Sequence, residues 1–400
     1  MKTKRNDCCP CGSGKKYKKC CFQKQKSNNN KVDKVKVDNI DRWVIRLLKK
    51  NINLKLGEKV LYPAITYFVV LLVALREGTT VEHESNDLKQ NGKDVPSADR
   101  ILGNIKRNIT IEELQSAFKS ITAEMLKIAK KHGKFGRWVL IAIDLHDTAY
   151  YGKNRDDPYV VGGKAKAGTN WFYRIATVSI VVFGVRFKIA SMPITKDDNK
   201  KLDEVVEYLI KEVRKNFKIR YVLLDRGFYS VKVVRKLKRL RAKYIMCARS
   251  CKGIREKSKK HGKKNFSTTW TLGGEIDVRL VSIYDKDAKK RLYYITNRDW
   301  KPLRIHEAYD GRWGIETGYR VVEEKDLWTT CKSIVVRYLY KIIAIVVYNM
   351  WVLKNLMLGI IIKEYKSGKK TIYKMTHISV VREFASVIKE IAGISSSDHG

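Results

Sequence analysis

Three acidic residues stand where folding can bring their carboxylates together. Asp144 and Asp225 each end a short apolar run that is typical of a buried strand, and Glu316 lies in a segment whose polar residues have helical spacing, 309–325. Carboxylates in close contact repel one another unless cations hold them, and hard oxygen ligands of this kind suit Mg²⁺ or Mn²⁺. Two such ions can activate a water or a 3′-hydroxyl and stabilise the leaving oxygen of a phosphodiester.

The segment 309–325 is predicted to be a helix with two faces. One face carries polar side chains of both charge signs: Tyr309, Arg312, Glu316, Arg320 and Glu323. The other face is apolar and can pack on a core. Three glycines interrupt the helix, and each costs roughly 1 kcal/mol relative to alanine, which indicates close approach of another group to the backbone.

The elements that position these acids alternate between strand and helix from residue 133 onward. Two apolar strands are expected to form a hairpin around Gly184, after the strand that ends at Asp144 and a loop. An amphipathic helix over 201–217 then leads to the strand that ends at Asp225, and a basic helix and another strand follow. This order predicts a mixed α/β sheet in which neighbouring strand ends place the two aspartates side by side.

The last part of the chain departs from that alternation. Residues 249–300 are expected to form a basic loop and a small β-rich insertion. The apolar stretch 334–362 is long enough to span a membrane, but three basic residues interrupt it, so we expect a buried helix that ends the domain 133–362. Residues 363–400 are predicted to be a C-terminal helical tail. No membrane association is expected.

The charge of the chain indicates a polyanionic partner. Its 83 Lys and Arg residues against 41 Asp and Glu give a formal net charge of +42. Excess acid serves solubility better than excess base, so nucleic acid is favoured as the partner. The polar, basic start of the chain has no apolar core of a secretory signal, which predicts a cytoplasmic location.

Cysteines crowd the first 25 residues. The thiolates of Cys9, Cys11, Cys20 and Cys21 can fold a short loop around one tetrahedral Zn²⁺, whereas disulfides are disfavoured in a cytoplasmic chain. The run CPCGSGKKYKKCC resembles the SEC-C zinc motif, which implies a zinc knuckle used for partner or nucleic-acid contacts. Residues 26–37 are interpreted as a polar linker.

Residues 38–132 have a helical pattern. Thr110 and Glu113 have the spacing of a capping box at the start of one of these helices. Short helices with many basic residues suit a DNA-binding domain, which is our prediction, and equally suit a plain helical bundle.

The segments IAIDLHDTAYYG, YVLLDRGFYS and YDGRWGIETGYR together resemble the DDE transposases of insertion sequences. The resemblance covers roughly 137–350 and implies an RNase H-like catalytic domain with a β-rich insertion. It also implies that Asp144, Asp225 and Glu316 hold Mg²⁺ or Mn²⁺. The implied substrates are double-stranded DNA at the element's ends and at the target, and the implied assembly is a homodimer on DNA.

The third of these segments resembles the signature Y-x2-R-x3-E-x6-K of one subgroup. Tyr309 and Arg312 would then position a DNA phosphate, with Arg320 and Lys325 as further DNA contacts. The last signature position holds Glu323 instead of lysine, and Lys325 stands two residues on, so the identity of the DNA-contacting lysine stays open.

The sequence leaves open the identity of the first acid and the role of two tryptophans. Asp147 competes for the first acidic position through its HDT context, but Asp144 is favoured because it ends the apolar run. Trp270 and Trp300 are interpreted as core or hairpin residues rather than as platforms for a flipped base.

The leading hypothesis is a transposase that cuts its element's ends and joins them to target DNA. The alternatives are an inactive DNA-binding relative and an RNase H-like nuclease.

Overall fold

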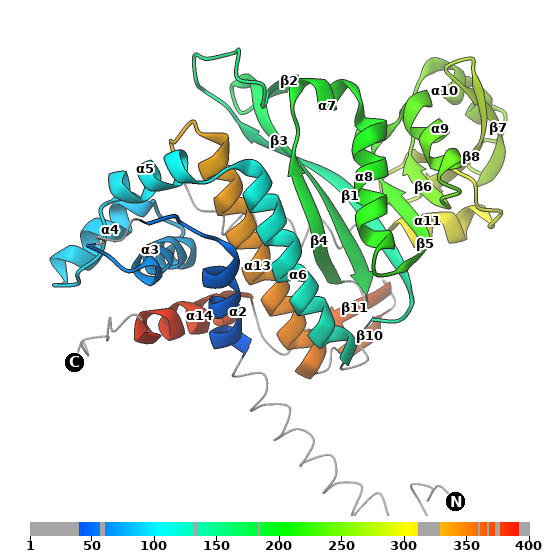
Figure 1. Cartoon of the computed structure of the whole chain (residues 1–400). Helices are drawn as coiled ribbons and strands as arrows, with labels where there is room; N and C mark the ends of the chain where they lie inside the picture. Colours follow the sequence, from blue (N-terminus) through cyan, green and yellow to red (C-terminus); the bar gives the residue numbers. More distant parts are fainter. Residues whose placement is uncertain are drawn as a thin grey trace, which may run out of the picture.

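The computed structural model describes most of the chain. The described residues are 40–56, 61–131, 135–182, 185–310, 329–358, 361–365, 368–372 and 377–391. Within them, a large twisted sheet has helices packed against it, and a separate group of helices lies beyond the long helices that cover the sheet (Figure 1).

A mixed sheet of nine strands contains the predicted strands of the α/β region. Its main path runs in the order β2 (Val160–Lys166), β3 (Thr169–Val182), β1 (Trp138–Ala149), β5 (Lys218–Leu224), β6 (Tyr244–Cys247), β9 (Lys290–Thr296), β8 (Ile276–Asp285) and β7 (Phe266–Leu272), and β4 (Val185–Pro193) pairs with β3 off this path. The β1–β5 and β5–β6 pairs are parallel, and the other pairs are antiparallel. The predicted β3–β4 hairpin is therefore present.

Helices precede the sheet, as the pattern of residues 38–132 predicts. They are α2 (Ile40–Asn51), α3 (Ala64–Glu77), α4 (Val81–Gln90), α5 (Ala98–Asn108) and α6 (Ile111–Lys131). The predicted capping box at the start of α6 is formed, since the Glu113 N–H donates to Thr110 Oγ1 at 3.2 Å and the Thr110 N–H donates to Glu113 Oε2 at 2.9 Å.

Side chains of the central strands alternate between two faces of the sheet. Ile143 of β1 lies in the larger hydrophobic cluster, together with residues of α6, α8 (Leu202–Arg214) and α13 (Ile334–Leu358). Ala142 lies in a smaller cluster on the opposite face, together with residues of α11 (Pro302–Asp310). Both faces of the parallel strands are therefore covered, as parallel pairing requires.

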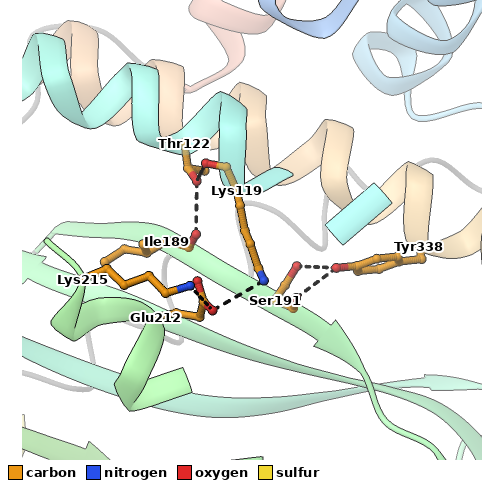
Figure 2. Close-up of polar contacts among 7 residues, drawn as sticks. All are labelled: Lys119, Thr122, Ile189, Ser191, Glu212, Lys215 and Tyr338. Carbon is orange, nitrogen blue, oxygen red and sulfur yellow. Dashed lines mark hydrogen bonds and ion pairs between the residues drawn. The ribbon is translucent and has the colours of Figure 1, made fainter. Parts of the chain in front are cut away.

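The strand β4 has its backbone held by the helices α6 and α13 (Figure 2). Thr122 of α6 lies with its hydroxyl 3.1 Å from the Ile189 carbonyl oxygen, and the Tyr338 hydroxyl of α13 donates to the Ser191 carbonyl at 3.0 Å. The Asn349 amide of α13 also exchanges two hydrogen bonds with the backbone of Lys188, at 2.9 and 2.7 Å. These side chains bond to backbone groups of β4 from the helix side, which protects the strand from edge-to-edge association.

The predicted apolar helix is α13, and it is buried inside the protein. It is long and apolar enough to cross a membrane by length and composition, but 94% of its most apolar window is buried. The region after it differs from the predicted helical tail, because β10 (Ile361–Tyr365) and β11 (Gly368–Ile372) form a two-stranded sheet before α14 (His377–Ile391). The helix α14 packs on α2 and α3, far from it in sequence.

Two further segments differ from prediction. A loop is expected after Asp144, but β1 continues to Ala149 because β3 pairs with it as far as that residue. The expected basic loop after residue 249 contains a helix, α10 (Lys252–Lys259), with Ile254 and Ser258 buried. The β-rich insertion is present as β7 to β9, which continue the main sheet through the β6–β9 pair.

A buried ion pair joins α13 to the first described helix, α2. The Lys354 ammonium of α13 contacts the Asp41 carboxylate of α2, and both side chains are fully buried. It also lies 2.9 Å from a carboxylate oxygen of Glu383 on α14. One cation on α13 therefore links α14, 29 positions away, to α2, 313 positions away in the sequence.

Replacing this cation is expected to destabilise the protein strongly. Lys354→Met should lower the free energy of unfolding by about 3–5 kcal/mol, because the fully buried Asp41 carboxylate loses its contact with the Lys354 ammonium. The double variant Asp41→Asn with Lys354→Met should recover much of that loss. Urea denaturation checks both, and an unchanged midpoint for Lys354→Met would contradict the expectation.

Candidate active site

The register of two parallel strands brings the first two predicted acids together. Ile143 of β1 pairs with Leu224 of β5, and this is the last pair of the β1–β5 ladder. The next residues are Asp144 and Asp225, so the two carboxylates leave neighbouring strands at the same edge of the ladder. Both residues are half-buried.

The two aspartates also share one face of the sheet. Asp144 lies two residues after Ala142, and Asp225 lies two residues after Leu223; both of these apolar residues belong to the cluster under α11. Because successive side chains of a strand alternate between faces, the two acids project to the α11 side. Their shared edge and face make a paired acidic site.

Each carboxylate is oriented by the backbone amide that follows it. The Leu145 N–H donates to Asp144 Oδ1 at 2.9 Å, and the Arg226 N–H donates to Asp225 Oδ1 at 2.6 Å. Asp225 is also the N-cap of a short 3₁₀ helix, η2 (Arg226–Phe228). The amides fix the direction of both carboxylates without adding a competing charge.

Asp147, the alternative first acid, has a different partner and a different face. Its two carboxylate oxygens accept from Arg174 Nε and Nη2 at 2.6 and 2.7 Å, and Arg174 Nη1 donates to Asn199 Oδ1 at 2.6 Å. Asp147 lies three positions after Asp144 on β1, so its side chain projects to the other face. The geometry favours Asp144. Nothing in the local sequence marks Arg174, whose pairing with Asp147 follows from the β1–β3 register.

Tyr309 lies beside this site but is buried. Its side chain is 3% exposed, its ring lies 4.8 Å from that of Tyr294, and its hydroxyl donates to the Leu224 carbonyl oxygen at 3.3 Å. That carbonyl belongs to the peptide bond that leads into Asp225. The contact suits positioning of the second acid better than direct contact with a DNA phosphate.

Several predicted site residues lie outside the described residues. They are Arg312, Glu316, Arg320, Glu323 and Lys325, and the cysteines Cys9, Cys11, Cys20 and Cys21. The helix α11 begins earlier than the predicted helix and covers only its first two positions, Tyr309 and Asp310.

The described part of the site fits a divalent cation in its donor chemistry. Two adjacent aspartates offer the hard oxygen ligands that Mg²⁺ and Mn²⁺ prefer. Among the described residues there is no group of three or more metal-ligating side chains, and the predicted third ligand is Glu316.

The sheet order and the two acids that follow the last pair of the β1–β5 ladder together define an RNase H-like fold with a paired acidic site. Residues 139–333 match the family described as the transposase DDE domain, and residues 5–23 match the SEC-C motif. Through residues 139–333, just under half of its length, the chain is similar to the DDE transposases, which are DNA transposase enzymes, and it carries an SEC-C motif near its N-terminal end.

One solved structure shows the same fold over most of the chain. It is the cryo-EM structure of piggyBac transposase in a synaptic complex with hairpin DNA, with a TM-score of 0.55 and 15% sequence identity. The similarity covers 90% of this chain and 80% of that one. A search of curated proteins finds no match.

The two candidate first acids should respond differently to substitution. Asp147→Asn is expected to lower the free energy of unfolding by about 1–3 kcal/mol, because Arg174 loses its charged partner. It should keep DNA cleavage at temperatures where it is folded, whereas Asp144→Asn should lose cleavage. Thermal unfolding and cleavage of the same preparations check this. Loss of cleavage by folded Asp147→Asn alone would make Asp147 the first acid.

Proposed function

We propose that this transposase cuts DNA at the ends of its own insertion sequence and joins the exposed 3′-hydroxyls to target DNA. The observation that carries the proposal is the position of Asp144 and Asp225 directly after the last pair of the parallel β1–β5 ladder, on one face of the domain. Glu316 is the third acid of the proposed site. Asp144, Asp225 and Glu316 would hold Mg²⁺ or Mn²⁺.

In the proposed reaction the attacking oxygen comes from water or from a 3′-hydroxyl. A bound cation would supply activation of that oxygen and charge stabilisation of the leaving oxygen. The new bond forms to phosphorus as the bond to the leaving 3′-oxygen breaks, so no covalent bond to the protein is needed. The residues of the chain orient the reactants: the backbone amides of Leu145 and Arg226 fix two carboxylates, and Tyr309 supports the strand end before Asp225.

The substrate and assembly follow from charge and from the solved relative. A formal charge of +42 supplies the docking surface for double-stranded DNA, and Arg312, Arg320 and Lys325 are the proposed contacts near the third acid. The piggyBac structure is described as a synaptic complex. We infer that two copies of this chain likewise hold two DNA ends, as a homodimer that acts in the cytoplasm.

The SEC-C motif is proposed to hold one Zn²⁺ through Cys9, Cys11, Cys20 and Cys21. So small a unit has too few residues for a hydrophobic core, so metal binding would supply its folding free energy. Its role is auxiliary to the acidic site.

A cleavage assay tests the proposed reaction. DNA that carries the gene's own flanking sequences is incubated with Mg²⁺ and wild-type protein, Asp225→Asn or Glu316→Gln. Wild type should cut at both ends, and each substitution should reduce the rate by roughly 10³-fold or more, because cation ligation supplies several kcal/mol.

Asp197→Asn is the matched control, since this carboxylate is 82% exposed and, among the described residues, pairs with surface Lys200. It should cleave like wild type. Binding without cleavage by every protein, with Mn²⁺ as well, would indicate an inactive DNA-binding relative. Cleavage without regard to the element ends would indicate an RNase H-like nuclease.

Removal of the zinc motif should leave the chemistry intact. A protein without residues 1–25 is expected to retain cleavage of the element ends, because the acids are held by the sheet and not by the motif. Circular dichroism confirms that the shortened protein is folded, and abolished cleavage by such a protein would show that the motif takes part in catalysis.

A further inference from the structure

A cavity of about 590 Å³ lies on the α11 side of the sheet, toward the starts of β1 and β5. Its walls combine aromatic rings with guanidinium groups: Trp138, Tyr221 and Trp300 with Arg220, Arg298 and Arg304. Trp138 starts β1, six residues before Asp144, and Tyr221 lies four residues before Asp225. By strand alternation, both aromatic residues are on the face that carries the two acids.

The aromatic and cationic groups are arranged in layers. The guanidinium carbons of Arg298 and Arg304 lie 4.1 and 4.5 Å from the centroid of the Trp300 ring. The Tyr221 ring meets Trp300 edge-on, with centroids 5.4 Å apart and an interplanar angle of 89°. Trp300 is therefore not simply a hairpin residue, because it holds two arginines in place at the cavity wall.

The backbone around Arg298 is fixed by its neighbours. Its N–H donates to Thr296 Oγ1 at 3.0 Å, and its carbonyl accepts from Arg279 Nη1 at 2.6 Å. The Arg298 Nε is buried, and it has no hydrogen-bond partner among the described residues. A preorganised guanidinium with an unused donor is suited to an anionic oxygen.

The cavity is positively charged and has one exposed ring. Three arginines face a single acid at its wall, Glu307. Trp138 is 52% exposed, and the Lys218 ammonium lies 5.4 Å from its ring centroid. Burial raises the pKa of Tyr221 although the arginines act against it, so its hydroxyl stays a neutral hydrogen-bond donor near neutral pH.

We propose that this cavity binds a DNA strand outside the cleavage site, with a phosphate on Arg298 and Arg304 and the adjoining base stacked on Trp138. The inference rests on the proposed function and adds a second DNA contact on the catalytic face. Guanidinium groups pair with phosphate oxygens in a fork geometry, and an exposed tryptophan stacks on any base. An acidic peptide would use the charges but leave the ring unused.

The distance along β1 sets which nucleotide is bound. Six residues at about 3.3 Å each separate Trp138 from Asp144 by roughly 20 Å. At about 3.4 Å per nucleotide along one strand, this corresponds to roughly six nucleotides from the scissile phosphate. Flanks shorter than this should not reach the cavity.

The test measures binding of the full-length protein to labelled element-end DNA by fluorescence anisotropy. The DNA carries single-stranded flanks of two or ten nucleotides beyond the cleavage site, and EDTA prevents cleavage. Trp138→Ala and Arg304→Ala should each weaken binding of the long-flank DNA by about tenfold, because stacking or a charge-assisted contact is lost. Binding of the short-flank DNA should be unchanged. Trp138→Phe should retain most of the affinity, since it keeps a ring.

Arg214→Ala serves as the matched control, because Arg214 is exposed on α8 and contacts the Leu240 carbonyl outside the cavity. Equal weakening of both DNAs by the cavity variants, or of neither, would overturn the inference. If polyglutamate competes with the labelled DNA as strongly as unlabelled flank DNA does, the ligand of the cavity is an acidic peptide and not a DNA strand. Flank-dependent binding without cleavage in Mg²⁺ would overturn transposition alone, and cleavage without flank dependence would overturn the cavity inference alone.

Discussion

The parallel pairing of β1 with β5 is the constraint on which the acidic site depends. The pair Ile143–Leu224 ends the ladder, so Asp144 and Asp225 meet only in this register. A slip of one residue would send one carboxylate to the opposite face. Parallel strands keep a fixed register when both faces are buried, and here α6, α8 and α13 cover one face while α11 covers the other.

The helix α13 connects this sheet to the helices of the N-terminal region. On one side its Tyr338 (Figure 2) and its Asn349 hold the backbone of β4. On another side its Lys354 contacts Asp41 of α2. The larger hydrophobic cluster accordingly runs without a break from α2 through the sheet to α14. Motion of the N-terminal helices relative to the sheet would require breaking buried polar contacts, which cost several kcal/mol when left unpaired.

Local sequence was sufficient for the elements that depend on local patterns. The strands before Asp144 and Asp225, the helix near 201–217 and the Thr110–Glu113 capping box are all present, because apolar runs, helical periodicity and cap chemistry act over a few residues. The extension of β1 to Ala149 was not predictable in this way, because it depends on pairing with β3.

The parts of the site also differ in whether local sequence or long-range pairing determines them. The placement of Asp144 and Asp225 on neighbouring strands was accessible from the apolar runs, but the preference for Asp144 over Asp147 needed the face of each side chain and the partner Arg174. The arginine and tryptophan cavity joins residues from positions 138 to 304, and no short motif records such a combination. Isolated basic residues are indistinguishable in a chain with 83 of them.

The helix α11 relates the cavity to the acidic site. Its first turn carries Arg304, which stacks on Trp300, and its last turn carries Tyr309, whose hydroxyl contacts the carbonyl before Asp225. A phosphate bound at Arg304 would therefore act on the helix that supports the second acid. Asp310, the last residue given for α11, lies six positions before Glu316 in the sequence. DNA bound at the cavity, as we propose, would thus act on the second acid through one short helix.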